Sequence, residues 1–130
     1  MKFFKLIVLT LLFPLFSYAQ TDFTGDWKID WSDENGMAHS LKLTIASDGT
    51  YALDMEMDGN VNVKGKYEMD GDKMTIWDTE GEYACGSDKK GVYQVMASAT
   101  SMTMTRVSDE CTERGDPSGV MTFQRLSSVK

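Results

Sequence analysis

The sequence predicts an all-β protein with a single eight-stranded antiparallel up-and-down (meander) barrel. Three Asp-Gly pairs interrupt alternating apolar and polar residues between positions 46 and 73, and this dipeptide is a strong signal for a tight hairpin turn. The pairs are Asp48-Gly49, Asp58-Gly59 and Asp70-Gly71. Continued to the C-terminus, the same alternation gives about eight strands, which is enough to close a small barrel.

The N-terminal segment 1–19 is typical of a secretory signal peptide. Lys2 and Lys5 precede an apolar run over 6–16, and Ser17-Tyr18-Ala19 places small residues at the two positions that a signal peptidase inspects. This run is short for a membrane span, and no later segment is continuously apolar, so we expect no span after cleavage. The sequence therefore predicts export to the periplasm or the extracellular space and one barrel domain over 20–130.

Charge and cysteine content narrow the possible partners and the compartment. The chain has a formal net charge of −7, and cleavage removes two lysines and no acid, which argues against nucleic acid as a partner. Cys85 and Cys111 are the only cysteines, and both lie in the exported part, where an oxidising compartment favours pairing. Such a disulfide would stabilise the fold by about 3 kcal/mol.

The first four strands each have one apolar face and one polar face, as half-buried strands do. Helical spacing fits none of these runs. The expected inward residues are, strand by strand, Trp27, Ile29 and Trp31; Leu41, Leu43 and Ile45; Tyr51, Leu53, Met55 and Met57; and Val61, Val63, Gly65 and Tyr67.

Side-chain parity then predicts the hairpin registers, because both strands of a hairpin must keep their inward faces on the same side of the sheet. A loop over 47–49 pairs Ile45 with Tyr51, and a loop over 70–73 pairs Met69 with Met74 and Tyr67 with Ile76. A loop over 58–60 pairs Met55 with Val63 and Tyr51 with Tyr67 inside, and Asp54 with Lys64 outside. The last pair matches opposite charges, which favours that register.

Three further strands are expected over 91–98, 101–107 and 120–126. For the first of them the pattern leaves the inward face open. The two alternatives are Val92, Gln94 and Met96, or Tyr93, Val95 and Ala97.

The meander topology divides the loops between two ends of the barrel. The short turns over 47–49 and 70–72 share one end, while the segments 32–39, 78–90 and 108–118 and the Asp58 turn share the other. This places Cys85 and Cys111 on one rim, as a disulfide requires. Most acidic residues fall on the same rim, where they either provide solubility or form a negative mouth that attracts a cationic ligand or a basic protein.

Short motifs resemble those of lipocalin-like (calycin) barrels. Gly25-Asp26-Trp27 opens the first strand, and Arg125 follows in the last. The pattern Asp78-x-x-Gly81-x-x-x-Cys85, Gly91-x-Tyr93 and Asp109-x-Cys111-x-x-Arg114 is similar to small bacterial secreted domains of this kind. The resemblance implies that Gly25, Trp27 and Arg125 form a structural barrel floor, with the arginine lying across the tryptophan ring.

The residues predict neither a catalytic site nor a metal or cofactor site, so we expect a protein that is not an enzyme. His39 has no sequence neighbour that would make it a base, and paired cysteines remove the usual thiol nucleophile. Asp-x-Asp spacings without further loop ligands are a weak calcium signal. The Met-x-Met pairs 55/57 and 102/104 leave three interpretations, namely a Cu(I) site, core filling and an adaptable pocket lining.

The function expected from this pattern is the binding of a small hydrophobic or amphiphilic, including cationic, ligand inside the barrel of a monomer. The residues expected to line the ligand are Tyr51, Leu53, Met55, Met57, Val63, Tyr67, Met102 and Met104. The alternative is an acidic protein-binding module, such as an exported inhibitor of a cationic, lysozyme-like hydrolase.

Overall fold

The computed structural model describes residues 22–127, so the expected signal peptide lies outside the described residues. These residues form eight strands: β1 (Gly25–Ser32), β2 (Ala38–Ile45), β3 (Thr50–Asp54), β4 (Val63–Asp70), β5 (Lys73–Glu80), β6 (Gly91–Ala97), β7 (Ser101–Asp109) and β8 (Val120–Ser127). Over 22–127 there is no helix with the length and apolar character needed to cross a membrane.

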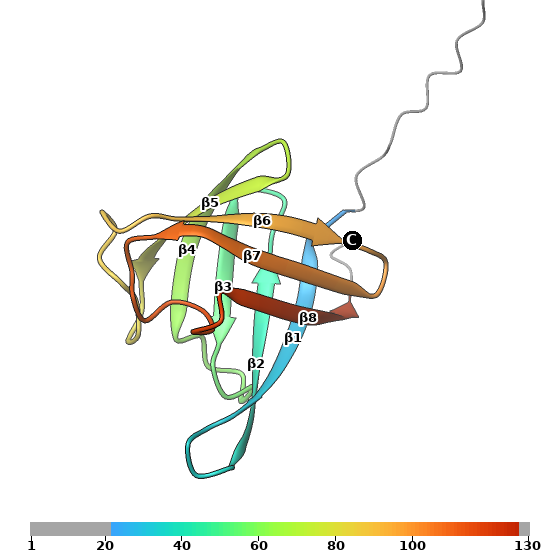
Figure 1. Cartoon of the computed structure of the whole chain (residues 1–130), viewed down its shortest axis with the longest axis vertical. Helices are drawn as coiled ribbons and strands as arrows, with labels where there is room; N and C mark the ends of the chain where they lie inside the picture. Colours follow the sequence, from blue (N-terminus) through green and yellow to red (C-terminus); the bar gives the residue numbers. More distant parts are fainter. Residues whose placement is uncertain (1–21, 128–130) are drawn as a thin grey trace, which may run out of the picture.

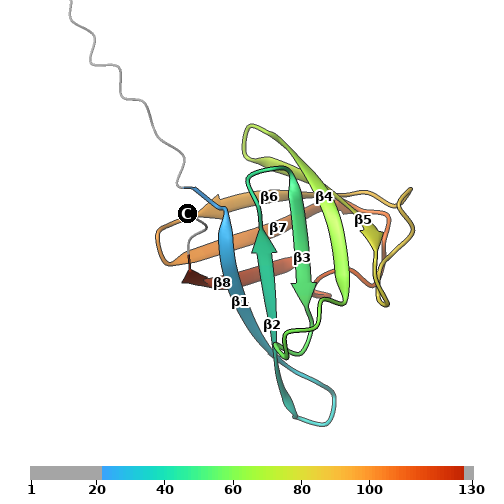
Figure 2. The same ribbon diagram turned by 180° about the vertical axis from the view of Figure 1, so that it is seen from behind.

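The strands close into a barrel. Each pairs antiparallel with the next along the chain, and β8 pairs with β1. Strands β6, β7 and β8 run across strands β1 to β4, and the core lies between the two layers (Figures 1 and 2). The predicted fold class, an all-β eight-stranded meander barrel, is confirmed.

Two of the three predicted hairpin registers are confirmed. Ile45 pairs with Tyr51, and the turn between them contains Gly49 in the left-handed region, with a φ of 89°. Met69 pairs with Met74, and Tyr67 with Ile76. Turn chemistry combined with side-chain parity is therefore sufficient to place these strands.

The predicted β3–β4 register is wrong by two residues. Val63 pairs with Leu53 and not with Met55, and Gly65, not Tyr67, lies opposite Tyr51. Because the shift is an even number, the inward faces remain as predicted. Strand β3 ends earlier than expected and β4 begins later, so the loop between them spans residues 55–62.

Asp54 explains the early end of β3. Its carboxylate is only 4% exposed and accepts hydrogen bonds from the amides of Asp58 (3.1 Å) and Gly59 (2.8 Å). A buried carboxylate with such donors is well satisfied, so it caps the loop instead of pairing with Lys64. The Lys64 ammonium lies 3.5 Å from Glu80 instead.

The structure also settles the inward face of β6. Tyr93 and Val95 are buried, Ala97 packs against the core, and Met96 is exposed. All eight strands contribute to one core cluster. Its buried members are Trp27, Leu43, Ile45, Tyr51, Val63, Met74, Ile76, Tyr93, Val95, Met102, Met104 and Phe123.

The barrel opens at its long-loop end because some strand pairs separate there. The pairing of β1 with β8 ends at Lys28 and Gln124, and the pairing of β5 with β6 is confined to Lys73–Ile76 and Gly91–Gln94. The outer half of β1 pairs only with β2, and this hairpin extends beyond the rest of the barrel (Figure 1). The candidate site is on this end.

Candidate functional site

At the tight-turn end, Arg125 lies across the Trp27 ring as expected. Trp27 is fully buried, and its indole N–H donates to the carbonyl of Phe23 at 2.8 Å. The Arg125 guanidinium lies 4.2 Å from the Trp27 ring centroid and donates to the carbonyls of Thr24 (2.9 Å) and Asp22. These contacts connect residues 22–24 to β8 and surround Trp27 with protein groups, as expected of a structural residue.

The residues expected to line a ligand fall into two groups. Tyr51, Val63, Met102 and Met104 are buried in the core cluster, and Leu53 and Tyr67 are partly buried against it. Met55 and Met57 follow the end of β3, so they belong to the 55–62 loop and not to the barrel wall. The structure therefore brings six of the eight together inside and places two on the rim.

A buried polar network lies between the core and the long-loop end. The Tyr51 hydroxyl donates to Asp78 across β4, which is possible because residue 65 is glycine. A Cβ on Gly65 would lie 2.2 Å from Tyr51 Cζ. Burial, followed by the hydrogen bond to Asp78, raises the pKa of Tyr51 far above its usual range.

Arg114 connects this network to the β7–β8 loop. Its guanidinium lies 2.9 Å from Asp109 Oδ1 and 3.6 Å from Asp78 Oδ2, and it donates to the carbonyl of Lys89 at 3.1 Å. Tyr93 donates to Asp109 Oδ2 at 2.5 Å, and burial together with this bond raises the pKa of Tyr93 to about 12. Asp78 and Asp109, which the sequence places on an exposed acidic rim, are thus buried and paired.

The predicted disulfide between Cys85 and Cys111 is confirmed and lies beside this network. The two Cα atoms are 6.3 Å apart. The Cys85 amide donates to Asp78 at 2.8 Å, and the Cys111 amide donates to Asp109 at 2.8 Å. The same two carboxylates therefore hold both loops and the arginine, which closes this half of the barrel end.

The other half of this end remains open and carries a stacked aromatic pair. Trp31 and His39 are directly paired across β1 and β2, and their ring centroids are 4.4 Å apart. His39 Nε2 lies 2.9 Å from Asp33, and Nδ1 lies 3.8 Å from Glu56 in the β3–β4 loop. The Asp33 hydrogen bond is the largest cause of the raised pKa of His39.

Sequence reasoning missed this cluster because it found no partner for His39. Asp33 is six residues away in the sequence, and Glu56 is on another hairpin. The sequence analysis treats 32–39 as a loop, whereas β2 begins at Ala38 in the structure. The observed β1–β2 register is what places His39 opposite Trp31.

Exposed apolar side chains lie at this end on β1 and on three loops. We call them the rim patch, which consists of Trp31, Met37, Met57, Val61 and Tyr83, with exposures between 38% and 63%. The loops that carry them are in contact, since His39 approaches Glu56 and the Tyr83 amide donates to the carbonyl of Asn62 at 3.4 Å. Asp33, Glu34, Glu56 and Asp58 lie in the same segments. The rim patch is therefore an apolar surface among acids.

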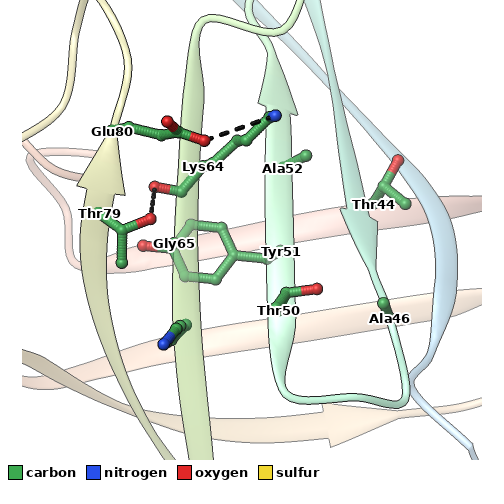
Figure 3. Close-up of a pocket in the computed structure, with 10 residues that line it drawn as sticks. Thr44, Ala46, Thr50, Tyr51, Ala52, Lys64, Gly65, Thr79 and Glu80 are labelled. Carbon is green, nitrogen blue, oxygen red and sulfur yellow. Dashed lines mark hydrogen bonds and ion pairs between the residues drawn. The ribbon is translucent and has the colours of Figure 1, made fainter.

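A shallow hollow of about 350 Å³ lies elsewhere, on the outer face of β2 to β5. Thr44, Thr50, Lys64 and Thr79 are among its lining residues (Figure 3). Lys64 is held by Glu80, and the Thr79 hydroxyl donates to the Lys64 carbonyl at 3.2 Å. This hollow lies outside the barrel and contains few of the residues expected to line a ligand.

The described residues offer no group of three or more His, Cys, Asp or Glu side chains placed to hold a metal ion. Comparison of the chain with protein-family models, with curated proteins and with solved structures found no match. Fold and site geometry alone therefore define the class of the protein, which is a small closed β-barrel with a disulfide-bonded, network-filled end and an open acidic and aromatic rim.

Proposed function

We propose that this protein is an exported binding protein that recognises a basic, partly apolar protein partner with its open rim. The observation that carries the proposal is the rim patch, five exposed apolar side chains set among carboxylates on contacting loops. Contiguous exposed apolar residues with a polar surround are typical of interaction sites. Aromatic residues and methionine are also enriched at the centres of protein interfaces.

Charge favours a basic partner. The acids of the β1–β2 and β3–β4 loops carry part of the net −7 charge, and complementary potentials accelerate association and select partners. An exported inhibitor of a cationic, lysozyme-like hydrolase is one function of this type. The disulfide fits an oxidising compartment, and the signal-like segment 1–19 supports export to the periplasm or the cell exterior.

The test is titration of the protein with a lysozyme as a cationic probe. We expect Trp31→Ala and Met57→Ala to weaken binding about 30-fold and several-fold respectively, since buried aromatic anchors dominate interface energies. Met96→Ala is the matched control, because Met96 is exposed on β6 at the opposite end. Equal affinities in all three variants, or affinity unchanged by high salt, would contradict the proposal.

The second candidate function is the binding of a small hydrophobic or amphiphilic ligand within the barrel. The observation that favours it is the methionine content of the interior, where Met74, Met102 and Met104 are buried and Met69 and Met121 pack against them. Methionine adapts to irregular guests because it is flexible and polarisable. Titration with a fatty acid and with a cationic amphiphile should then change Trp27 fluorescence, and an unchanged spectrum would count against this candidate.

A further inference from the structure

We propose that the partner binds by adding a strand to the free edge of β1, as an extended segment of alternating basic and apolar residues. This inference rests on the proposed rim function and specifies how the rim is used. The edge in question is Ile29–Ser32, which pairs with β2 on one side only. An unpaired strand edge is a ready template for another chain.

The hydrogen-bond pattern shows which groups of this edge are free. The Asp33 amide donates to the carbonyl of Met37 at 3.0 Å, so residues 33, 31 and 29 direct their backbone groups toward β2. The amides and carbonyls of Asp30 and Ser32 consequently point away from β2. Beyond the last β1–β8 pair, Lys28 with Gln124, no described residue is paired with them.

The neighbouring edge of the same hairpin is less accessible. His39 on β2 approaches Glu56, so the β3–β4 loop lies beside that side of the hairpin. No described strand lies beside β1 beyond Lys28, and the hairpin extends past the barrel there (Figure 2). The β1 edge is therefore the side on which an incoming strand meets least obstruction.

Side chains along the edge define the partner's chemistry. Trp31 and Ile29 lie on the inner face of β1, while Asp30 and Ser32 are exposed on the outer face. Asp30 lies 3.3 Å from the Lys28 ammonium and accepts a hydrogen bond from Ser40, so a cation of the added strand would share this carboxylate. Asp33 and Glu34 follow at the tip. Cross-strand neighbours stabilise a sheet when apolar faces apolar and opposite charges meet. An added strand with apolar residues on one face and lysine or arginine on the other satisfies both faces.

The stability of the hairpin gives a second reason for a partner. Over its outer half it is a two-stranded ribbon with exposed Trp31 and Met37, and such a ribbon is marginal in water by itself. A third strand would supply backbone hydrogen bonds and cover part of the Trp31 ring. Binding and ordering of the ribbon are thus expected together.

The test uses the mature protein and an acetylated, amidated octapeptide of alternating lysine and valine, with the glutamate and valine octapeptide as charge control. Ser32→Pro removes one edge amide without touching the β1–β2 ladder, and Ser32→Ala is its matched control because it keeps the amide. We expect the lysine peptide to bind Ser32→Ala like the unmodified protein and Ser32→Pro about tenfold more weakly. Amide hydrogen exchange of the unmodified protein should slow at Asp30 and Ser32 when the peptide is added.

Three results would overturn strand addition: no binding of the lysine peptide, equal binding to both Ser32 variants, or unchanged exchange at Asp30 and Ser32. Equal binding of the glutamate peptide would overturn the basic character of the partner. The exchange measurement uses the unmodified protein, so it tests strand addition even if Ser32→Pro folds poorly. Lysozyme binding that depends on Trp31 but not on the Ser32 amide would retain the rim function and reject the strand mechanism.

Discussion

Gly65 is the residue whose small size allows the buried polar network to form. Its missing side chain leaves room for the Tyr51 ring to pass over β4 and reach Asp78. The sequence pattern predicts only that Gly65 faces inward. Its role is visible once Tyr51 and Asp78 are known to lie on its two sides.

Gly65→Ala should lower the free energy of unfolding by about 3 kcal/mol, because a new Cβ would clash with Tyr51 and with the Trp77 carbonyl. Gly36→Ala is the control. It has open space around it but a φ of 76°, so it should cost only about 1 kcal/mol. Urea unfolding of both variants measures the difference, and equal losses would argue against the close contact.

Arg114 is the second residue that controls the closed half of the rim. Replacing it with methionine leaves Asp78 and Asp109 buried without their cation, which should cost about 3–5 kcal/mol of unfolding free energy. The exposed Lys89→Met is the control and should change stability little. If urea melts of the two variants coincide, Arg114 does not neutralise the buried carboxylates.

At the scale of elements, the β1–β2 hairpin and the β3–β4 loop are joined by His39. The pKa of His39 is raised first by the hydrogen bond to Asp33 in the same hairpin and less by Glu56, and only the Glu56 contribution favours the joined arrangement. This contribution is complete below the ordinary histidine pKa of about 6.5 and is lost as pH rises through the higher value in the folded protein.

We therefore expect the 55–62 loop to become more mobile as the pH is raised from mildly acidic to alkaline. NMR titration of His39 should give a pKa above its ordinary value, with line shapes at Glu56 changing over the same pH range. His39→Gln should abolish the pH response of this loop. A His39 pKa at or below the ordinary value would disprove the link.

The elements show which parts of the fold are predictable from sequence. Asp48-Gly49 and Asp70-Gly71 fix their registers because the turn chemistry and the inward faces agree. The Asp58 turn does not follow the same rule, because the Asp54 carboxylate accepts hydrogen bonds from the amides of Asp58 and Gly59. The alternation of apolar and polar residues does not reveal such a bond from a side chain to the backbone. The Asp54–Lys64 charge match was thus a misleading guide to that register.

At the scale of the whole molecule, barrel closure and the position of the disulfide follow from meander topology, and both are confirmed. The character of the long-loop end is less predictable. From the sequence, Asp78 and Asp109 are expected to belong to an exposed acidic rim. In the structure both carboxylates are buried and form ion pairs with Arg114, which lies five residues after Asp109. Other acids of the β5–β6 and β7–β8 loops, such as Glu82, Asp88 and Glu113, stay exposed, so the acidic surface extends over both halves of this end.

Removing the disulfide should lower the stability of the whole barrel, because the bond restricts the unfolded chain. Cys85 and Cys111 are 26 residues apart, and the double change to alanine should lower the unfolding free energy by about 3 kcal/mol through the greater freedom of the unfolded chain. Thermal unfolding with and without reductant provides the same comparison on the unmodified protein. A melting temperature that is insensitive to both changes would contradict this expectation.

The most direct test of rim recognition is NMR chemical-shift mapping of the protein during titration with lysozyme. Recognition at the rim predicts the largest shifts at the Trp31 indole, His39 and the amides of the 55–62 loop, with the Trp27 indole and the Met102 and Met104 methyl groups unchanged. Shifts concentrated at Trp27 and these methyl groups, or no shifts at all, would contradict the proposal that the open rim is the binding surface.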